Sequence, residues 1–256
     1  MDLGVSGSNA IVLGGSRGIG FYTAKLLLEE GANVAFCARD KAGVDAAVSS
    51  LKEVPGDGRV FGVAADLTDA EATRGFVRES IDVLGGVDIL IHNASGFGWD
   101  NSESEWQRSF QVDVMAGVRA VDEALRALKD SSAGSVVFIG STASKFHFFG
   151  RPPSPYGAVK AAMRTFANEL AQSYGRYGIR VNVVSPGAVW FPGGVWDKRK
   201  EADPDFYARV EKGIPLGRLG TAEELARVIV FAASPAGLWL NATHLSVDGG
   251  QVAVVD

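Results

Sequence analysis

The sequence contains few of the residues that form cross-links or bind metals. Its 256 residues include one cysteine, Cys37, and three histidines, His92, His147 and His244. A single cysteine excludes an intramolecular disulfide and a cysteine-rich metal site, and it fits a reducing compartment. Cys37 falls within an apolar run, where a thiol is expected to be buried and unreactive. The histidines stand too far apart along the chain to suggest a metal site, so we expect no bound metal.

Two further absences limit the partners of the protein. The formal net charge is −5 and the pI is near 5.3, so no basic field favours nucleic acid or an anionic membrane. No uncharged apolar run reaches the roughly 18–20 residues that cross a bilayer. Residues 1–9 contain an acid and neither Lys nor Arg, whereas a secretory signal opens with a basic region. We therefore expect a cytoplasmic protein with no nucleic-acid or membrane partner.

The chain consists of short apolar runs that alternate with longer amphipathic stretches. Nearly continuous apolar runs are typical of strands that are covered on both faces. The predicted strands are residues 9–13, 33–38, 60–64, 88–92, 135–139, 180–184 and 244–247. The predicted helices are residues 18–30, 41–52, 69–84, 103–129, 155–174 and 222–233. This alternation, with no linker or internal repeat, predicts one α/β domain over residues 1–256. We expect a Rossmann fold with a doubly wound, mostly parallel seven-stranded sheet and helices on both faces.

Some helix ends carry their own chemical signals. Thr68 followed by Glu71 predicts a capping box at the start of the third helix. Gly31 and Gly85 stand where helices must stop.

A glycine-rich segment lies between the first predicted strand and the first predicted helix. It reads Gly14-Gly15-Ser16-Arg17-Gly18-Ile19-Gly20. Glycines at these positions allow a tight turn, a close approach of the backbone to a pyrophosphate, and close packing of helix on strand. The helix N-terminus presents free N–H groups and the positive end of its dipole to phosphates. Since a strand precedes the segment and a helix and a strand follow it, the segment predicts a dinucleotide site.

The end of the second predicted strand indicates which dinucleotide is bound. A site for NAD has a carboxylate there, which accepts from the ribose 2′-hydroxyl. Here Ala38 stands at that place and Arg39 follows it. A guanidinium forks onto a 2′-phosphate, which a carboxylate would repel, and Arg17 in the glycine loop can reach the same phosphate. The two arginines favour NADP(H) over NAD(H), although Asp40 adjoins Arg39 and could pair with it.

Three side chains suggest acid–base chemistry on a substrate oxygen. Tyr156 and Lys160 are four residues apart in a predicted helix, so they lie on one face, one turn apart. A phenol, with a pKa of about 10, is a weak acid–base group at neutral pH, and a nearby ammonium makes it usable. Ser141 follows the fifth predicted strand, at the edge of a parallel sheet where ligands bind.

These motifs stand in a distinctive order. They are the glycine loop, His92-Asn93-Ala94-Ser95-Gly96, Ser141, Tyr156, Lys160, Ser185-Pro186-Gly187 and Val247-Asp248-Gly249-Gly250. The order resembles that of short-chain dehydrogenases/reductases, in the branch that includes 3-oxoacyl-carrier-protein reductase-like enzymes, and the resemblance covers residues 9–250. It implies an oxidoreductase that moves a hydride between NADP(H) and a carbonyl or secondary alcohol carbon.

The resemblance implies a role for each matching residue. Tyr156 is the expected general acid/base, Lys160 activates it and binds the nicotinamide ribose, and Ser141 holds the substrate oxygen. Asp113 stands where the family has an Asn whose backbone carbonyl holds a relay water, and its carboxylate adds a negative charge near Lys160. The implied cofactor-binding residues are Gly14, Ser16, Arg17, Gly18, Ile19, Gly20, Arg39, Asp66, Leu67, Asn93, Ala94, Ser95, Tyr156, Lys160, Pro186, Gly187 and Val189.

Other positions depart from the family. Leu13 replaces a Thr that makes a small structural hydrogen bond before the first glycine. The separation of Ser141 and Tyr156 suggests an insertion within residues 146–153. The segment Ala188-Val189-Trp190 lacks the Thr that often binds the cofactor after Pro-Gly.

The resemblance also implies a substrate lid over residues 188–216. Its aromatic residues either pack on one another or contact the substrate, and they favour an apolar or ring-shaped substrate. They are Trp190, Phe191, Trp196, Phe206 and Tyr207.

The resemblance also implies that the protein assembles with copies of itself. Members of the family pair the helices that correspond to residues 103–129 and 155–174 about two-fold axes, which implies a homotetramer, or at least a dimer.

Two functions are alternatives to an enzyme: a cofactor-binding redox sensor without turnover, and a structural subunit. A pure binding protein has no need of Tyr156, which argues against the sensor, and nothing in the chain favours the structural subunit.

Overall fold

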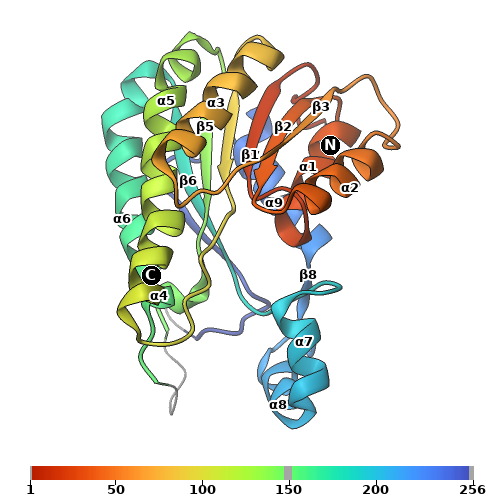
Figure 1. Cartoon of the computed structure of the whole chain (residues 1–256), viewed down its shortest axis with the longest axis vertical. Helices are drawn as coiled ribbons and strands as arrows, with labels where there is room; N and C mark the ends of the chain where they lie inside the picture. The colour runs from red at the N-terminus through yellow and green to blue at the C-terminus, as the bar shows by residue number, and fades with distance from the viewer. Residues whose placement is uncertain (1, 147–151, 254–256) are drawn as a thin grey trace.

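The computed structural model describes residues 2–146 and 152–253, and a parallel sheet lies at its centre (Figure 1). Its seven strands run in the order β3-β2-β1-β4-β5-β6-β9. They are β1 (Asn9–Leu13), β2 (Asn33–Ala38), β3 (Val60–Ala64), β4 (Ile89–His92), β5 (Ser135–Ile139), β6 (Arg180–Pro186) and β9 (His244–Val247). A second, two-stranded pair joins β7 (Val189–Trp190) to β8 (Gly220–Thr221). The strand order reverses between β1 and β4, where open α/β sheets bind ligands beyond the carboxyl ends of the strands.

Helices cover both faces of the sheet (Figure 1). One face carries α1 (Gly18–Glu29), α2 (Lys41–Leu51) and α9 (Ala222–Ala233), and the other carries α3 (Ala70–Leu84), α5 (Ala116–Asp130) and α6 (Pro155–Tyr174). Each face buries its own cluster of apolar side chains, as a sheet with helices on both sides requires. The predicted doubly wound Rossmann fold is confirmed.

A smaller layer lies beyond the carboxyl edge of the sheet (Figure 1). It contains α7 (Val195–Ala202) and α8 (Pro204–Gly213), two helices that the sequence reading left unassigned within the lid. Its own buried cluster, which we call the lid core, consists of Ala188, Tyr207, Val210, Ile214 and Leu219.

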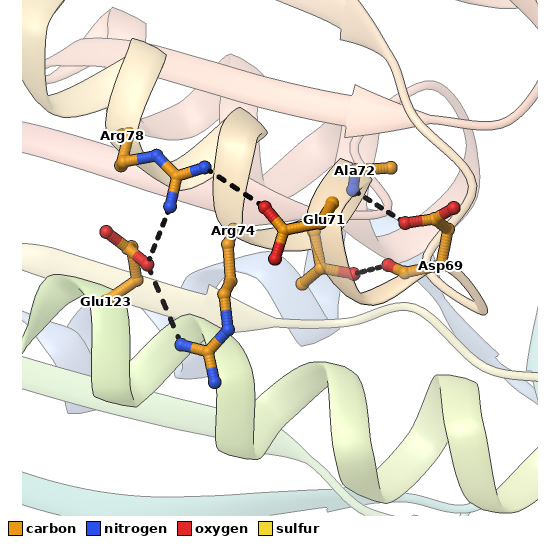
Figure 2. Close-up of polar contacts among 7 residues, drawn as sticks. Asp69, Glu71, Ala72, Arg74, Arg78 and Glu123 are labelled. Atoms are coloured by element: carbon orange, nitrogen blue, oxygen red, sulfur yellow. Dashed lines mark hydrogen bonds and ion pairs between the residues drawn. The ribbon is translucent and has the colours of Figure 1, made fainter.

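The capping box predicted for α3 is wrong. Asp69 is the N-cap, and its carboxylate accepts from the Ala72 N–H at 2.9 Å (Figure 2). The Thr68 hydroxyl instead donates to Asp66 at 2.9 Å, which stabilises the turn before the helix. A carboxylate at the N-cap also interacts with the positive end of the helix dipole, which a hydroxyl does not. Asp69 is therefore favoured over Thr68 at this position.

Glu71, which the box would have used, takes part in a different contact. Figure 2 shows it pointing along α3 to Arg78, at 3.5 Å. Glu123 of α5 lies 3.2 Å from Arg78 and 3.6 Å from Arg74, so the two helices are joined by charges above their apolar contact.

The helix predicted over residues 103–129 is confirmed in its extent, but it is not a regular α-helix throughout. The structure has α4 (Glu103–Ser109), then a π-helical segment over Phe110–Met115, then α5. Val112, Asp113 and Val114 are three successive buried residues, which a regular 3.6-residue period cannot bury on one face. The wider π turn turns Asp113 inward, and such turns are frequent at functional sites.

The other predicted elements are confirmed to within two residues. β4 begins at Ile89 rather than Asp88, whose carboxylate accepts from the Asn9 N–H at 2.8 Å and from the Ser131 hydroxyl at 2.5 Å. β6 continues to Pro186. Gly85 ends α3 in the left-handed conformation, as its position predicted. None of the helices in the described part of the chain is both long and apolar enough to cross a bilayer.

Candidate active site

A cavity of about 890 Å³ lies between the carboxyl edge of the sheet and the lid. It brings together Ser141 after β5 with Tyr156 and Lys160 of α6, as the sequence predicted. Besides Tyr156 and Lys160, six other predicted cofactor residues line the same cavity: Ile19, Asn93, Ser95, Pro186, Gly187 and Val189. Within the described residues, no three His, Cys, Asp or Glu side chains gather as a metal site would require.

The start of α6 positions the Tyr–Lys pair. Pro155 is the first helical residue, where its missing N–H costs no hydrogen bond, so Tyr156 lies in the first turn. Lys160 follows one turn later and is 2% exposed. Its Nζ donates to the Ile139 carbonyl at 2.8 Å and lies 6.0 Å from the centre of the Tyr156 ring. The ammonium is therefore held beside the phenol by the sheet itself.

Asp113 faces the same ammonium. Its Oδ1 lies 3.0 Å from the Lys160 Nζ, and its Oδ2 accepts from the Gly96 N–H at 2.8 Å. Its backbone carbonyl, the group expected to hold a water, accepts from the His92 Nε2–H at 3.0 Å. Asp113 thus links α6, the loop after β4 and the end of β4 through three groups of one residue.

His92 is the last residue of β4, and its side chain is buried. Its ring packs edge-on against Phe138, with centroids 5.9 Å apart. Burial, and then the charge of Lys160, lower the pKa of His92 to about 4, against an opposing effect of Asp113. His92 is therefore neutral at physiological pH, and it fixes the Asp113 backbone as well as packing.

The loop after β4 supports the glycine loop. Asn93 Nδ2 donates to the Gly14 carbonyl at 2.6 Å. Gly14 has φ +86°, and a Cβ there would lie 2.9 Å from the Ala94 Cα. Gly14 is therefore required both by its conformation and by the backbone beside it. Asn93 therefore supports the predicted phosphate loop through a hydrogen bond, and Ala94 supports it through backbone contact.

Comparison with known proteins agrees with this geometry. A family model described as enoyl-(acyl carrier protein) reductase matches residues 14–251. Isoepoxydon dehydrogenase patN of Penicillium expansum is 35% identical over 252 residues, which are 98% of this chain and 96% of that one. The 3-oxoacyl-[acyl-carrier-protein] reductase FabG of Chlamydia pneumoniae is 32% identical over 255 residues, 98% and 99% of the two chains.

A solved structure adds to these relatives. L-sorbose reductase from Gluconobacter frateurii, crystallised with NADPH and L-sorbose, matches with a TM-score of 0.89 and 29% identity, covering 100% of both chains. This chain belongs to the short-chain dehydrogenase/reductase family. The resemblance seen in its motifs is confirmed.

This short-chain dehydrogenase/reductase has an aromatic ring where its lid meets the glycine loop. Gly18 has φ +55°, and a Cβ built on it would lie 2.5 Å from the Phe191 ring. Phe191 also lines the cavity, so it is one of the lid aromatics that faces the site. Gln251, which the sequence reading missed, accepts from the Ala188 N–H at 2.7 Å and lines the cavity too.

An aromatic wall, formed by Phe97 and Trp99, stands beside the phenol of Tyr156. The two rings lie 6.1 Å and 5.2 Å from the Tyr156 ring and 6.0 Å from each other. Phe97 has φ +51°, which is uncommon for a bulky residue, and its N–H donates to the Ser95 hydroxyl at 3.2 Å. The sequence reading missed this wall, although the alternation Gly96-Phe97-Gly98-Trp99 was a visible signal.

The residues predicted for the outer part of the cofactor are solvent-facing. Arg17 and Arg39 are exposed. Asp40 accepts from the Gly43 N–H at 3.0 Å as the N-cap of α2, so its carboxylate has a structural role. The hydrogen bond from the Thr68 N–H is the largest cause of a lowered pKa for Asp66; burial opposes it, and the Thr68 hydroxyl and the charge of Arg39 add to the lowering.

Two other predictions need separate comment. The Leu67 side chain packs into the core, so it offers only its backbone to a ligand. Of the insertion predicted within residues 146–153, residues 147–151 lie outside the described residues, while Phe146, Pro152 and Pro153 line the cavity.

Proposed function

We propose that this short-chain dehydrogenase/reductase transfers a hydride between NADP(H) and the carbon of a ketone or secondary alcohol. The observation that carries the proposal is the convergence of Ser141, Tyr156 and Lys160 on one cavity with predicted cofactor residues. The related L-sorbose reductase, whose structure contains NADPH and L-sorbose, supports the choice of cofactor and reaction.

The residues present fit a dinucleotide phosphate. Gly14 and Gly18 have φ +86° and +55°, which a tight turn needs, and Gly18 begins α1, whose first N–H groups can donate to a phosphate. Arg17 and Arg39 offer guanidinium groups for a 2′-phosphate, and Asp66 is the proposed adenine contact. NADP(H), when bound, supplies or accepts the hydride.

The protein's own residues manage the proton. In the reductive direction, Tyr156 donates its phenolic proton to the carbonyl oxygen as the new alcohol forms. Ser141 orients that oxygen with a hydrogen bond. The buried ammonium of Lys160 stabilises the phenolate that remains, and Asp113 holds Lys160 in place and moderates its charge.

The site favours a substrate with an apolar or ring-shaped part. Phe97 and Trp99 are 37% and 44% exposed although they stand in a braced loop beside Tyr156. Flat aromatic faces left open at a cavity are suited to stacking with a planar or cyclic group.

The decisive test combines a panel of carbonyl compounds with one variant. We expect NADPH-dependent reduction of cyclic and aryl ketones, and Tyr156→Phe should lose at least about 10²-fold in kcat because only the transferable proton has gone. Its affinity for NADPH should be retained. Binding of NADPH without turnover on the whole panel would instead favour the redox sensor, and full activity of Tyr156→Phe would refute the mechanism.

We further propose a cytoplasmic homotetramer, or at least a dimer. Trp106 of α4 and Phe110, which follows α4, are 39% and 44% exposed, and α4 contacts α6. A two-fold contact through these helices would cover them. Light scattering at micromolar concentration should give a mass of two or four chains, and a monomer would contradict the proposal.

A further inference from the structure

The lid presents one guanidinium to the cavity. Arg199 lies on α7 and lines the cavity together with Trp196 of the same helix. Its Cζ lies 5.1 Å from the centre of the Phe206 ring on α8, and the Trp196 ring stacks on Phe206 at 6.1 Å. Arg199 is thus held on an aromatic face with part of its side chain out of solvent.

No described residue that lines the cavity is an acid. The other cation of the lining, Lys160, is matched by Asp113, which lies behind it at 3.0 Å. Arg199 has only its contact with Phe206, since no ion pair joins it to any acid in the described residues. Among the described residues that line the cavity, Arg199 is therefore the one cation without a carboxylate partner.

Two of the acids near Arg199 in the chain are engaged elsewhere, and a third, Glu201, is exposed. Asp197 accepts from the Trp190 Nε1–H at 3.1 Å and from the Gly193 N–H at 2.8 Å, which shapes the turn before α7. Asp203 accepts from the Phe206 N–H at 3.0 Å as the N-cap of α8. These bonds hold both carboxylates to the backbone of the lid.

We propose that Arg199 binds an anionic group of the substrate, so that the substrate is a carbonyl compound with a carboxylate on its ring-shaped part. A guanidinium pairs with a carboxylate through two parallel hydrogen bonds, and a half-buried cavity strengthens such a pair. The inference rests on the proposed function, because it places the reacting carbonyl at Ser141 and Tyr156 and the anion at the lid.

The cofactor diphosphate is the other anion that could reach this charge. The lid residue that touches the glycine loop is Phe191, on Gly18, whereas Arg199 is held against Phe206 within the lid. This arrangement favours the substrate as the source of the anion, and the experiment below separates the two sources.

The test uses 4-acetylbenzoate and its uncharged counterpart 4-acetylbenzamide, which have nearly the same shape. Titration of each into the complex of the full-length protein with NADP+ gives the affinities, and NADPH-dependent reduction gives kcat/KM. We compare the native protein with Arg199→Met and Arg199→Lys. Lys198→Met is the matched control, because it removes a charge from an exposed position of the same helix that does not line the cavity.

We expect the acid to bind about 10-fold more tightly than the amide in the native protein and in Lys198→Met. Arg199→Met should remove the preference, and Arg199→Lys should retain part of it because a point charge lacks the fork. Equal affinities in the native protein, or no binding of either compound, would overturn the inference. So would an Arg199→Met protein that binds NADP+ more weakly but still prefers the acid.

Activity distinguishes this inference from the proposed function. Preferred binding of the acid with no reduction of either compound would support the anion site and count against the proposed reaction. Equal reduction of acid and amide would support the reaction and overturn the anion site.

Discussion

Asp113 and Lys160 form a buried ion pair, with Oδ1 and Nζ 3.0 Å apart and side chains 0% and 2% exposed. The resemblance to the family implies an Asn at this position, so the carboxylate of Asp113 is a departure of this chain. Breaking a buried pair leaves a charge without compensation, which is costly to stability. The same carboxylate weakens the positive field that the ammonium exerts on Tyr156.

Replacing Asp113 by Asn separates these two effects. We expect the basic limb of the pH–rate profile to move to lower pH by about one unit, because an uncompensated ammonium favours the phenolate. The free energy of unfolding should fall by roughly 3 kcal/mol. Asp122→Asn is the control, since it removes an exposed carboxylate from α5. A pH profile that stays in place would assign Asp113 a purely structural role.

Arg39 should determine cofactor choice. Because a charge-assisted hydrogen bond contributes roughly 1.5–3 kcal/mol, Arg39→Ala should reduce the preference for NADPH over NADH by about 10- to 150-fold. Steady-state kinetics with both cofactors measure the ratio of kcat/KM values. If the native protein uses NADH as well as NADPH or better, the assignment of NADP(H) is wrong.

Gly18 should tolerate no side chain. Gly18→Ala would place a Cβ 2.5 Å from the Phe191 ring on a backbone with φ +55°, so we expect the Kd for NADPH to rise at least about 10-fold. Phe191→Ala in the same protein should recover only the part due to the ring. Gly75→Ala, in open space on α3, should leave binding unchanged and stabilise the fold by up to about 1 kcal/mol. Normal binding by Gly18→Ala would refute the requirement.

His92 should make stability depend on pH in the acid range only. Its pKa is about 4 in the folded protein against 6.5 for the free group, so the unfolded chain binds more protons between these values. Stability should therefore fall as pH falls from 6.5 towards 4, by up to about 3 kcal/mol, with no contribution above 6.5. Urea unfolding of His92→Gln should give a flatter pH dependence. The same slope in both proteins would show that His92 is not responsible.

The central sheet was predictable because its strands are buried on both faces. Runs such as residues 10–13 of β1 are apolar throughout, and the glycines and caps between them mark where helices start and stop. The π-helical segment was not predictable from the sequence. Val112, Asp113 and Val114 are residue types that also occur in a regular α-helix, and their burial becomes visible only in the structure. The lid helices α7 and α8 were missed because they cover a small lid core and not the sheet. None of the residues of α7 is fully buried, so its sequence shows little alternation between apolar and polar faces.

The site was predictable where residue types stand in a fixed order, as for Ser141, Tyr156 and Lys160. The partners of these residues were not. His92 acts through one hydrogen bond to a backbone carbonyl, and no sequence pattern marks such a bond. Phe97 and Arg199 reach the cavity through loop geometry and the placement of the lid, which depend on contacts between distant segments.

The separate lid core allows the substrate-facing residues of the lid to evolve independently of the central sheet. It shares no residue with the two clusters that hold the helices on the sheet. Substitutions on the cavity side of α7, such as at Trp196 or Arg199, therefore leave those larger clusters untouched. New substrates can be accommodated by exchanging this layer, while the cofactor site and the folding of the sheet stay as they are.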